Sequence, residues 1–355
     1  MSISHRYNTL DGIRGIAAIV VVFSHLPKEY TPGLYVNGSF AVDLFFCLSG
    51  FVIAFSYLDK LQFGMSFREF LIRRIIRLYP MFFIGICIGG AMMVLKVLSG
   101  QLTLTLPKAI LSIILNSLYL PYLNESVING KTSDVFPANG PAWSLFFELV
   151  INIIFAFWII RGGKRSPLIL VLTGMFGMVV YTALKGYSFP GWGSDNFLGG
   201  FPRTIAGFFS GVYIFYLLNT YKNFVPKINP LFFIAFIIAL GIISTPNVYG
   251  NMFWLGITLG LIPILIALGA VSDSKSPLIR NVLNYLGWLS YPLYCLHTPI
   301  LSAYLLLMGN ANYGWWSTVT CVFVILLVSH LATKYVEEPI RARLSRIRSR
   351  NFVMV

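Results

Sequence analysis

The chain has 355 residues, of which 57% are hydrophobic and only 11% are charged. Soluble domains usually carry about 25% charged residues, so this composition excludes a water-soluble globule. The formal charge is +14, but the basic residues lie in short loops and at the ends of apolar runs. That placement indicates control of membrane topology and contact with anionic lipids, and it argues against nucleic-acid binding.

Strong apolar runs follow one another along the chain, each about as long as a helix that crosses roughly 30 Å of hydrocarbon. The strands of a membrane β-barrel would alternate apolar and polar residues, and these runs do not. We therefore predict an all-α, polytopic membrane protein with about ten transmembrane helices. The runs are 10–27, 39–58, 77–98, 143–160, 167–184, 198–218, 229–245, 252–271, 283–306 and 313–335.

A weaker run at 107–120 leaves a choice between ten and eleven crossings. Eleven crossings would place the basic segment 161–165 outside, against the positive-inside rule. We therefore predict ten crossings, both termini in the cytoplasm, and one long outer loop whose apolar part dips into the membrane or lies on it. Arg203 is among the few basic residues left on the outer side. The expected division is a membrane domain, 1–340, and a short basic tail, 341–355.

The first apolar run contains two ionisable residues, Arg14 and His25. Such residues are costly in lipid and are therefore candidates for function. On a helix they lie on nearly the same face and about 16 Å apart along the axis. A neutral imidazole is suited to removing a proton from a hydroxyl near pH 7. An anchoring arginine and an interfacial histidine would explain the spacing equally well.

Two carboxylates are predicted at the same depth as His25. Asp43 begins the second run and Glu148 lies in the outer part of the fourth. Either one would orient the imidazole and stabilise its protonated form, so we assign all three residues to catalysis. Alternatively, Asp43 satisfies free amides at a helix N-terminus. That alternative is weaker for Glu148, which lies beyond the first turn of its run.

A second cluster, Arg73, Arg74 and Arg77, lies just before the third run on the predicted cytoplasmic side. Guanidinium groups bind phosphates through forked hydrogen bonds. Coenzyme A carries a diphosphate and a 3′-phosphate, so the cluster, with Arg14, is a candidate site for this molecule. Anchoring against lipid headgroups is the alternative.

Three further residues are candidates for contact with the acceptor substrate. Trp143 is suited to stacking on a sugar or to anchoring at the interface. Ser144 is suited to donating to a developing oxyanion or to capping a helix. His297 lies between two prolines, a pattern typical of a kinked helix beside a cavity, although a packing role is an alternative. No two histidines have metal-ligand spacing, so we expect no metal.

Taken in order along the chain, these motifs resemble the acyltransferase-3 family of membrane proteins. That family includes the O-acetyltransferases of bacterial O-antigens, Nod factors and exopolysaccharides. The matching pieces are Leu10-Asp-Gly-Ile-Arg-Gly15 leading to His25, Val42-Asp-Leu-Phe-Phe-Cys-Leu-Ser-Gly-Phe51, Arg74 with Arg77, Trp143-Ser-Leu leading to Glu148, Ser290-Tyr-Pro-Leu-Tyr leading to His297, and Val336-Glu-Glu-Pro339.

The resemblance implies an enzyme of the bacterial inner membrane that transfers an acetyl group from acetyl-CoA. The acceptor would be a hydroxyl of a surface polysaccharide or lipid-linked sugar of the O-antigen type. It also implies that Arg14 and His25 are essential, and that the chain is of the stand-alone type without an esterase-like domain. The expected partners are acetyl-CoA, the glycan acceptor and membrane lipids. A transporter or flippase for a lipid-linked glycan, without acyl transfer, is the alternative.

Overall fold

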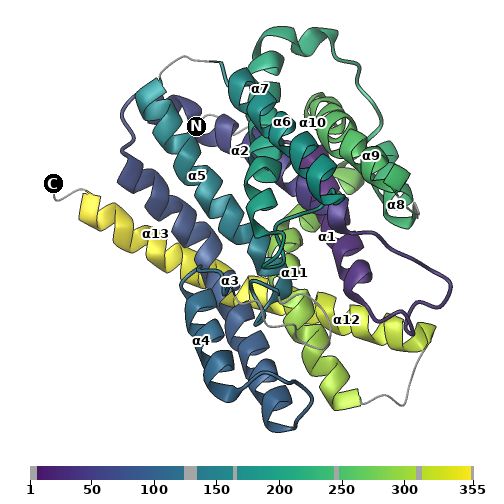
Figure 1. Cartoon of the computed structure of the whole chain (residues 1–355). Coiled ribbons are helices and arrows are strands. Elements are labelled where there is room, and N and C mark those ends of the chain that lie inside the picture. The colour runs from purple at the N-terminus through teal and green to yellow at the C-terminus, as the bar shows by residue number, and fades with distance from the viewer. Residues whose placement is uncertain (1–5, 124–133, 163–165, 244–247, 309–313, 353–355) are drawn as a thin grey trace.

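The computed structural model describes residues 6–123, 134–162, 166–243, 248–308 and 314–352. Within them the regular secondary structure is helical, apart from one isolated β-bridge between Asp134 and Gly193. The helices pack side by side into one bundle (Figure 1). Eight of the described helical segments are long and apolar enough to cross a membrane. The prediction of an all-α, polytopic membrane protein is therefore confirmed.

Most of the helices correspond to the predicted runs. In chain order they are α1 (Asn8–His25), α2 (Ser39–Gln62), α3 (Phe67–Leu98), α4 (Leu106–Ser117), α5 (Trp143–Gly162), α6 (Leu168–Lys185), α7 (Gly200–Tyr221), α8 (Pro230–Ile242), α9 (Val248–Gly256), α10 (Ile262–Val271), α11 (Pro277–Met308), α12 (Trp315–Ala332) and α13 (Glu338–Phe352). Short π-helical segments, Ile257–Leu261 and Thr333–Glu337, join α9 to α10 and α12 to α13. A 3₁₀ turn, Gly140–Ala142, leads into α5.

Helix α4 corresponds to the weak run at 107–120, and it is shorter than the roughly 20 residues that a membrane-spanning helix needs. Its 12 residues extend only about 18 Å. It lies along one half of α3 (Figure 1), and its last residue reaches the middle of that helix, where Tyr79 Oη donates to the Ser117 carbonyl at 3.1 Å. The chain then turns at Tyr119, whose φ is 62° and whose ring stacks on Phe82 at 3.7 Å. This short helix is compatible with the predicted outer loop whose apolar part dips into the membrane or lies on it, and its position relative to the membrane stays a prediction.

The remaining predicted spans are α1 and α8, with 18 and 13 residues. Segment 161–165 carried the argument for the orientation of the chain. Arg161 lies in the last turn of α5, and residues 163–165 lie outside the described residues. The cytoplasmic location of both termini therefore stays a prediction.

Helices α1 and α11 approach closely because glycines lie between them. A Cβ on Gly15 would lie 2.6 Å from the carbonyl carbon of Leu286, and one on Gly287 would lie 2.5 Å from Asp11 Cβ. Small residues allow helix backbones in membranes to come this close. As a result, the ionisable residues of α1 meet the polar residues of α11 along one shared seam.

Proline residues in α11 fix the segment that precedes α5. Pro299 has no N–H, so the carbonyl of Cys295, four residues earlier, loses its partner within the helix. Asn139 Nδ2 donates to that carbonyl at 2.8 Å, and Thr298 Oγ1 donates to Asn139 Oδ1 at 2.8 Å. The segment before α5 is thus bound to the middle of α11, and α5 begins inside the bundle instead of at its surface.

Candidate active site

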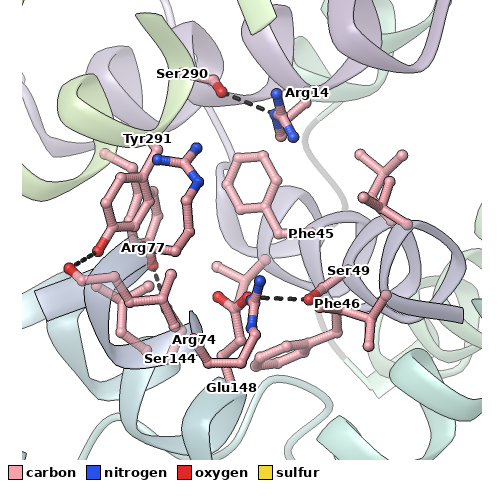
Figure 2. Close-up of a pocket in the computed structure, with 17 residues that line it drawn as sticks. Arg14, Phe45, Phe46, Ser49, Arg74, Arg77, Ser144, Glu148, Ser290 and Tyr291 are labelled. Carbon is pink, nitrogen blue, oxygen red and sulfur yellow. Dashed lines mark hydrogen bonds and ion pairs between the residues drawn. The ribbon is translucent and has the colours of Figure 1, made fainter. Parts of the chain in front are cut away.

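Arginine side chains line a cavity enclosed by α1, α2, α3, α5 and α11, which we call the arginine cavity. It has about 160 Å³ of open space. Figure 2 shows Arg14, Arg74 and Arg77 reaching the same space from different sides, with the ring of Phe45 between them. Glu148 is the one carboxylate among the described residues that line it. The guanidinium groups of three arginines line the cavity against one carboxylate, and their N–H donors favour an anionic ligand.

Two of these arginines are held by the protein and still remain partly exposed. Arg14 donates from Nε to Ser290 Oγ and from its terminal nitrogen to Asp11, each at 2.9 Å. Arg77 is paired with Glu337, and its guanidinium lies over the ring of Tyr291 at 5.0 Å. The side chains of Arg14 and Arg77 are 32% and 30% exposed. Both can therefore bind a ligand without leaving their partners.

Arg74 is enclosed instead. It is paired with Glu148 at 2.9 Å, and Ser49 donates to the same carboxylate oxygen at 2.9 Å. The Arg74 side chain is only 10% exposed, and its Nε has no partner among the described residues. A buried donor without a partner is costly, so this N–H is available for a polar group of a ligand.

The pairing of Glu148 with Arg74 corrects the prediction that Glu148 lies beside His25. The two residues line different cavities. The reason is the depth at which α5 begins. Because Asn139 binds the middle of α11, the first turn of α5 already lies inside the bundle, and Glu148 reaches the level of Arg74.

A second cavity, which we call the histidine cavity, contains about 460 Å³ of open space. His25 is exposed and lines it, together with Asp134, Trp192 and Tyr35. His25 Nδ1 lies 2.9 Å from the Val21 carbonyl oxygen. A carbonyl only accepts, so this contact places the proton on Nδ1 and leaves the lone pair on Nε2. His25 is thereby held in the tautomer that a general base requires.

The second predicted carboxylate, Asp43, is also not a partner of His25. It pairs with Arg203 through contacts of 2.6 and 3.0 Å, and Thr258 Oγ1 donates to it at 3.2 Å. Both members of the ion pair are 1% exposed. A buried guanidinium needs an anion beside it, and Asp43 is that anion. Arg203, predicted to be one of the outer basic residues, is buried and lines the histidine cavity.

Arg203 also determines the position of Trp143. Its guanidinium lies 5.3 Å from the centre of the Trp143 ring, and that side chain is only 7% exposed. Trp143 lines the histidine cavity, but the cation covers one face of its ring. The rings of Tyr35, 56% exposed, and of partly buried Trp192 are more accessible to a ligand there.

The remaining predicted site residues, Arg73, Ser144 and His297, lie in three different places. Arg73 forms an ion pair with Glu69 one helical turn away and does not line the arginine cavity. Ser144 lines that cavity. His297 is 1% exposed, its Nδ1 contacts the Tyr294 carbonyl oxygen at 2.9 Å, and its ring lies 5.0 Å from that of His25.

The two cavities share two lining residues, Val42 and Tyr294. Sequence reasoning did not single out Tyr294. A signal was present, because Ser290, Tyr294 and His297 follow one another at spacings of four and three, and residues at these spacings share one face of a helix. That face of α11 passes from the arginine cavity to the histidine cavity.

The bundle thus combines a cavity lined by arginines with an adjoining cavity lined by His25. The pattern of the Acyltransferase domain family matches residues 7–334. The chain belongs to the acyltransferase-3 family. The described ranges contain no group of three or more His, Cys, Asp or Glu residues placed to hold a metal ion.

Acyltransferase-3 relatives include several curated proteins. Protein 2 in picA locus of Rhizobium radiobacter is 33% identical, over 49% of this chain and 94% of the relative. Peptidoglycan O-acetyltransferase OatA of Listeria monocytogenes is 24% identical, over 94% of this chain and 55% of the relative. Acyltransferase MdmB of Streptomyces mycarofaciens is 29% identical, over 43% of this chain and 39% of the relative. The chain thus spans little more than half the length of OatA. No solved structure matches it.

Proposed function

We propose that this acyltransferase-3 protein transfers an acetyl group from cytoplasmic acetyl-CoA to a sugar hydroxyl on the other side of the bacterial inner membrane. The acceptor is a surface polysaccharide or a lipid-linked sugar, of the O-antigen type. The observation that carries the proposal is the pair of adjoining cavities: one is lined by three arginines, and the other contains a histidine whose free lone pair is set by its own helix.

The arginine cavity is suited to the thioester donor. Coenzyme A is anionic through its phosphates, and the exposed parts of Arg14 and Arg77 offer forked donors to phosphate oxygens. Cavities that enclose a whole ligand usually measure about 300–1,000 Å³. One of about 160 Å³ therefore holds only part of the donor. The nucleotide stays toward the cytoplasmic mouth, and Arg74, held by Glu148, lines the inner part.

The histidine cavity is suited to the acceptor. Its open space is larger, and the accessible rings of Tyr35 and Trp192 offer apolar surfaces to a pyranose. His25 Nε2 takes the proton from the sugar hydroxyl as its oxygen attacks the thioester carbon. Proton transfer by a positioned side chain contributes roughly 10²–10⁴-fold to a rate. His297 supports the His25 ring from the side.

The surface glycans of three strains test the proposal: one with the protein, one without it, and one carrying His25→Gln. Mass spectrometry before and after mild alkaline hydrolysis detects ester-linked acetyl groups, whichever sugar carries them. We expect these esters only in the strain with the unaltered protein. If the deletion strain keeps all of its esters but exports less glycan, a transport function replaces this proposal.

The donor is tested separately in membrane vesicles that contain the native acceptor. Radiolabelled acetyl-CoA is supplied to the cytoplasmic face, and label in the glycan fraction is counted. We expect incorporation that requires His25. Labelled acetate alone, without coenzyme A, should not be incorporated. Incorporation of free acetate at the same rate would contradict a coenzyme A thioester as the donor.

A further inference from the structure

Tyr294 lies at the boundary of the two cavities and lines both of them. Its side chain is nearly buried, with 6% exposure. Its hydroxyl oxygen lies 2.7 Å from Ser144 Oγ and donates to the Pro141 carbonyl at 3.0 Å. The other residue common to both cavities, Val42, has an apolar side chain. Tyr294 is therefore the polar side chain that the two described cavities have in common.

Acyl transfer requires the two substrates to meet at this boundary. Reacting atoms must approach to about 3–3.5 Å. If the thioester arrives through the arginine cavity and the hydroxyl through the histidine cavity, the reacting carbon lies where the cavities adjoin. His25 lines the histidine cavity together with Tyr294, and the ring of His297 lies 5.9 Å from that of Tyr294 and 5.0 Å from that of His25.

One of the two hydroxyl groups at the boundary of the cavities can turn its proton toward a ligand. Tyr294, Ser144 and the Pro141 carbonyl form three mutual contacts, of 2.7, 3.0 and 3.1 Å. Only two protons are available for these three contacts. If one hydroxyl turns toward a ligand, the other still donates to the Pro141 carbonyl. The N-terminal end of α5, where Ser144 lies, also favours negative charge nearby.

We propose that Tyr294, backed by Ser144, is a catalytic residue whose hydroxyl donates to the carbonyl oxygen of the donor thioester. This inference rests on the proposed function. As the sugar oxygen bonds to the carbonyl carbon, its proton passes to His25 Nε2, and the C=O electron pair moves onto the oxygen that Tyr294 binds. The C=O bond then re-forms, the C–S bond breaks, and the coenzyme A thiolate takes the proton from His25.

The test compares Tyr294→Phe with the unaltered protein in the vesicle assay, with acetyl-CoA concentration varied. Loss of one oxyanion donor lowers kcat by about 10²–10³-fold in known enzymes. We expect a fall of that order for Tyr294→Phe, with a KM for acetyl-CoA within about twofold. Ser144→Ala should lower kcat less, and the double variant should lose less than the product of the two single losses, because both hydroxyls act on one atom.

Tyr304→Phe is the matched control. It removes a hydroxyl from the same helix. Tyr304 Oη contacts Thr320 Oγ1 at 2.6 Å, and the residue lines neither cavity. We expect its kcat to match that of the unaltered protein. If Tyr294→Phe does not accumulate in the membrane, Ser144→Ala carries the test through its smaller fall in kcat at constant KM.

The outcomes separate this inference from the proposed function. If vesicles with the unaltered protein incorporate no label, the proposed function fails. If they do, but Tyr294→Phe keeps more than half of kcat, the assignment of Tyr294 is overturned. It is also overturned if the variant raises KM and leaves kcat unchanged, because the hydroxyl would then bind the ground state and the transition state equally.

Discussion

The rings of His25 and His297 meet edge to face, with their centroids 5.0 Å apart. Each ring directs Nδ1 toward a carbonyl of its own helix, at 2.9 Å in both cases. Both Nε2 atoms therefore keep their lone pairs. His25 faces the cavity, whereas His297 is 1% exposed, and its Nε2 has no partner among the described residues. In the proposed reaction, His25 is therefore the base and His297 is the residue that supports its ring.

Substitutions at His297 should distinguish packing against the His25 ring from a direct part in the reaction. His297→Phe keeps an aromatic ring against His25, so we expect its kcat to stay within about tenfold of the unaltered protein. His297→Ala leaves a space beside His25, and emptying a buried site of this size usually costs several kcal/mol, roughly 2–5. We expect it to lower both the thermal midpoint and kcat. Equal, complete loss of activity in both variants, at normal abundance, would show that the His297 nitrogens take part in the reaction.

Asp43 should matter for folding more than for chemistry. Asp43→Asn leaves Arg203 buried without an anion, and breaking such a pair costs roughly 3–5 kcal/mol. We expect a lower thermal midpoint and less protein in the membrane, with most of the activity per folded molecule retained. Thermal unfolding in detergent, together with activity normalised to folded protein, measures both. If the Asp43→Asn protein is stable but inactive, Asp43 instead has the predicted role of partner to the base His25.

Arg77 and Arg73 belong to the same cluster on α3, so Arg73 is the control for a substitution of Arg77. Arg77→Lys keeps the positive charge but loses the forked geometry, and a hydrogen bond to a charged group contributes about 1.5–3 kcal/mol. We expect the KM for acetyl-CoA to rise roughly tenfold to a hundredfold. Arg73→Lys, which alters the ion pair with Glu69 outside the cavity, should leave KM unchanged. Equal effects of the two variants would indicate that the cluster acts only as a diffuse positive surface.

The bond between Asn139 and the Cys295 carbonyl can be tested with a double variant. Asn139→Ala leaves that carbonyl unsatisfied, at a cost of roughly 1–3 kcal/mol. Pro299→Ala supplies an N–H four residues after Cys295 and restores the bond within the helix. We therefore expect the double variant to be more stable than Asn139→Ala alone. If the two losses simply add, Asn139 does not compensate for Pro299.

Hydropathy was sufficient to predict the helices of the bundle, because burial in lipid requires long apolar runs. Hydropathy left the weak run at 107–120 undecided, and the argument against an eleventh crossing came from the basic residues of segment 161–165. The spacing of Arg14 and His25 was informative because both lie on one helix, whose geometry is fixed. Contacts within a single helix can be predicted from spacing alone.

Pairings between helices could not be predicted in this way. Helices that are apolar on most sides do not reveal which face meets which neighbour. Asp43, Glu148 and His25 were therefore grouped by their expected depth alone. The structure instead pairs each carboxylate with an arginine from a distant part of the sequence. The expected depth of Glu148 was also wrong because nothing in its own run shows that α5 begins at the middle of α11.

The most direct test of this account is the turnover of vesicles carrying His25→Gln, supplied with saturating radiolabelled acetyl-CoA. His330→Gln is the matched control, because His330 lies on α12 and contacts Tyr285 away from both cavities. We predict that His25→Gln loses at least about 10²-fold in kcat, while His330→Gln retains full turnover at equal abundance. Turnover by His25→Gln within about twofold of the unaltered protein would contradict the assignment of His25 as the base.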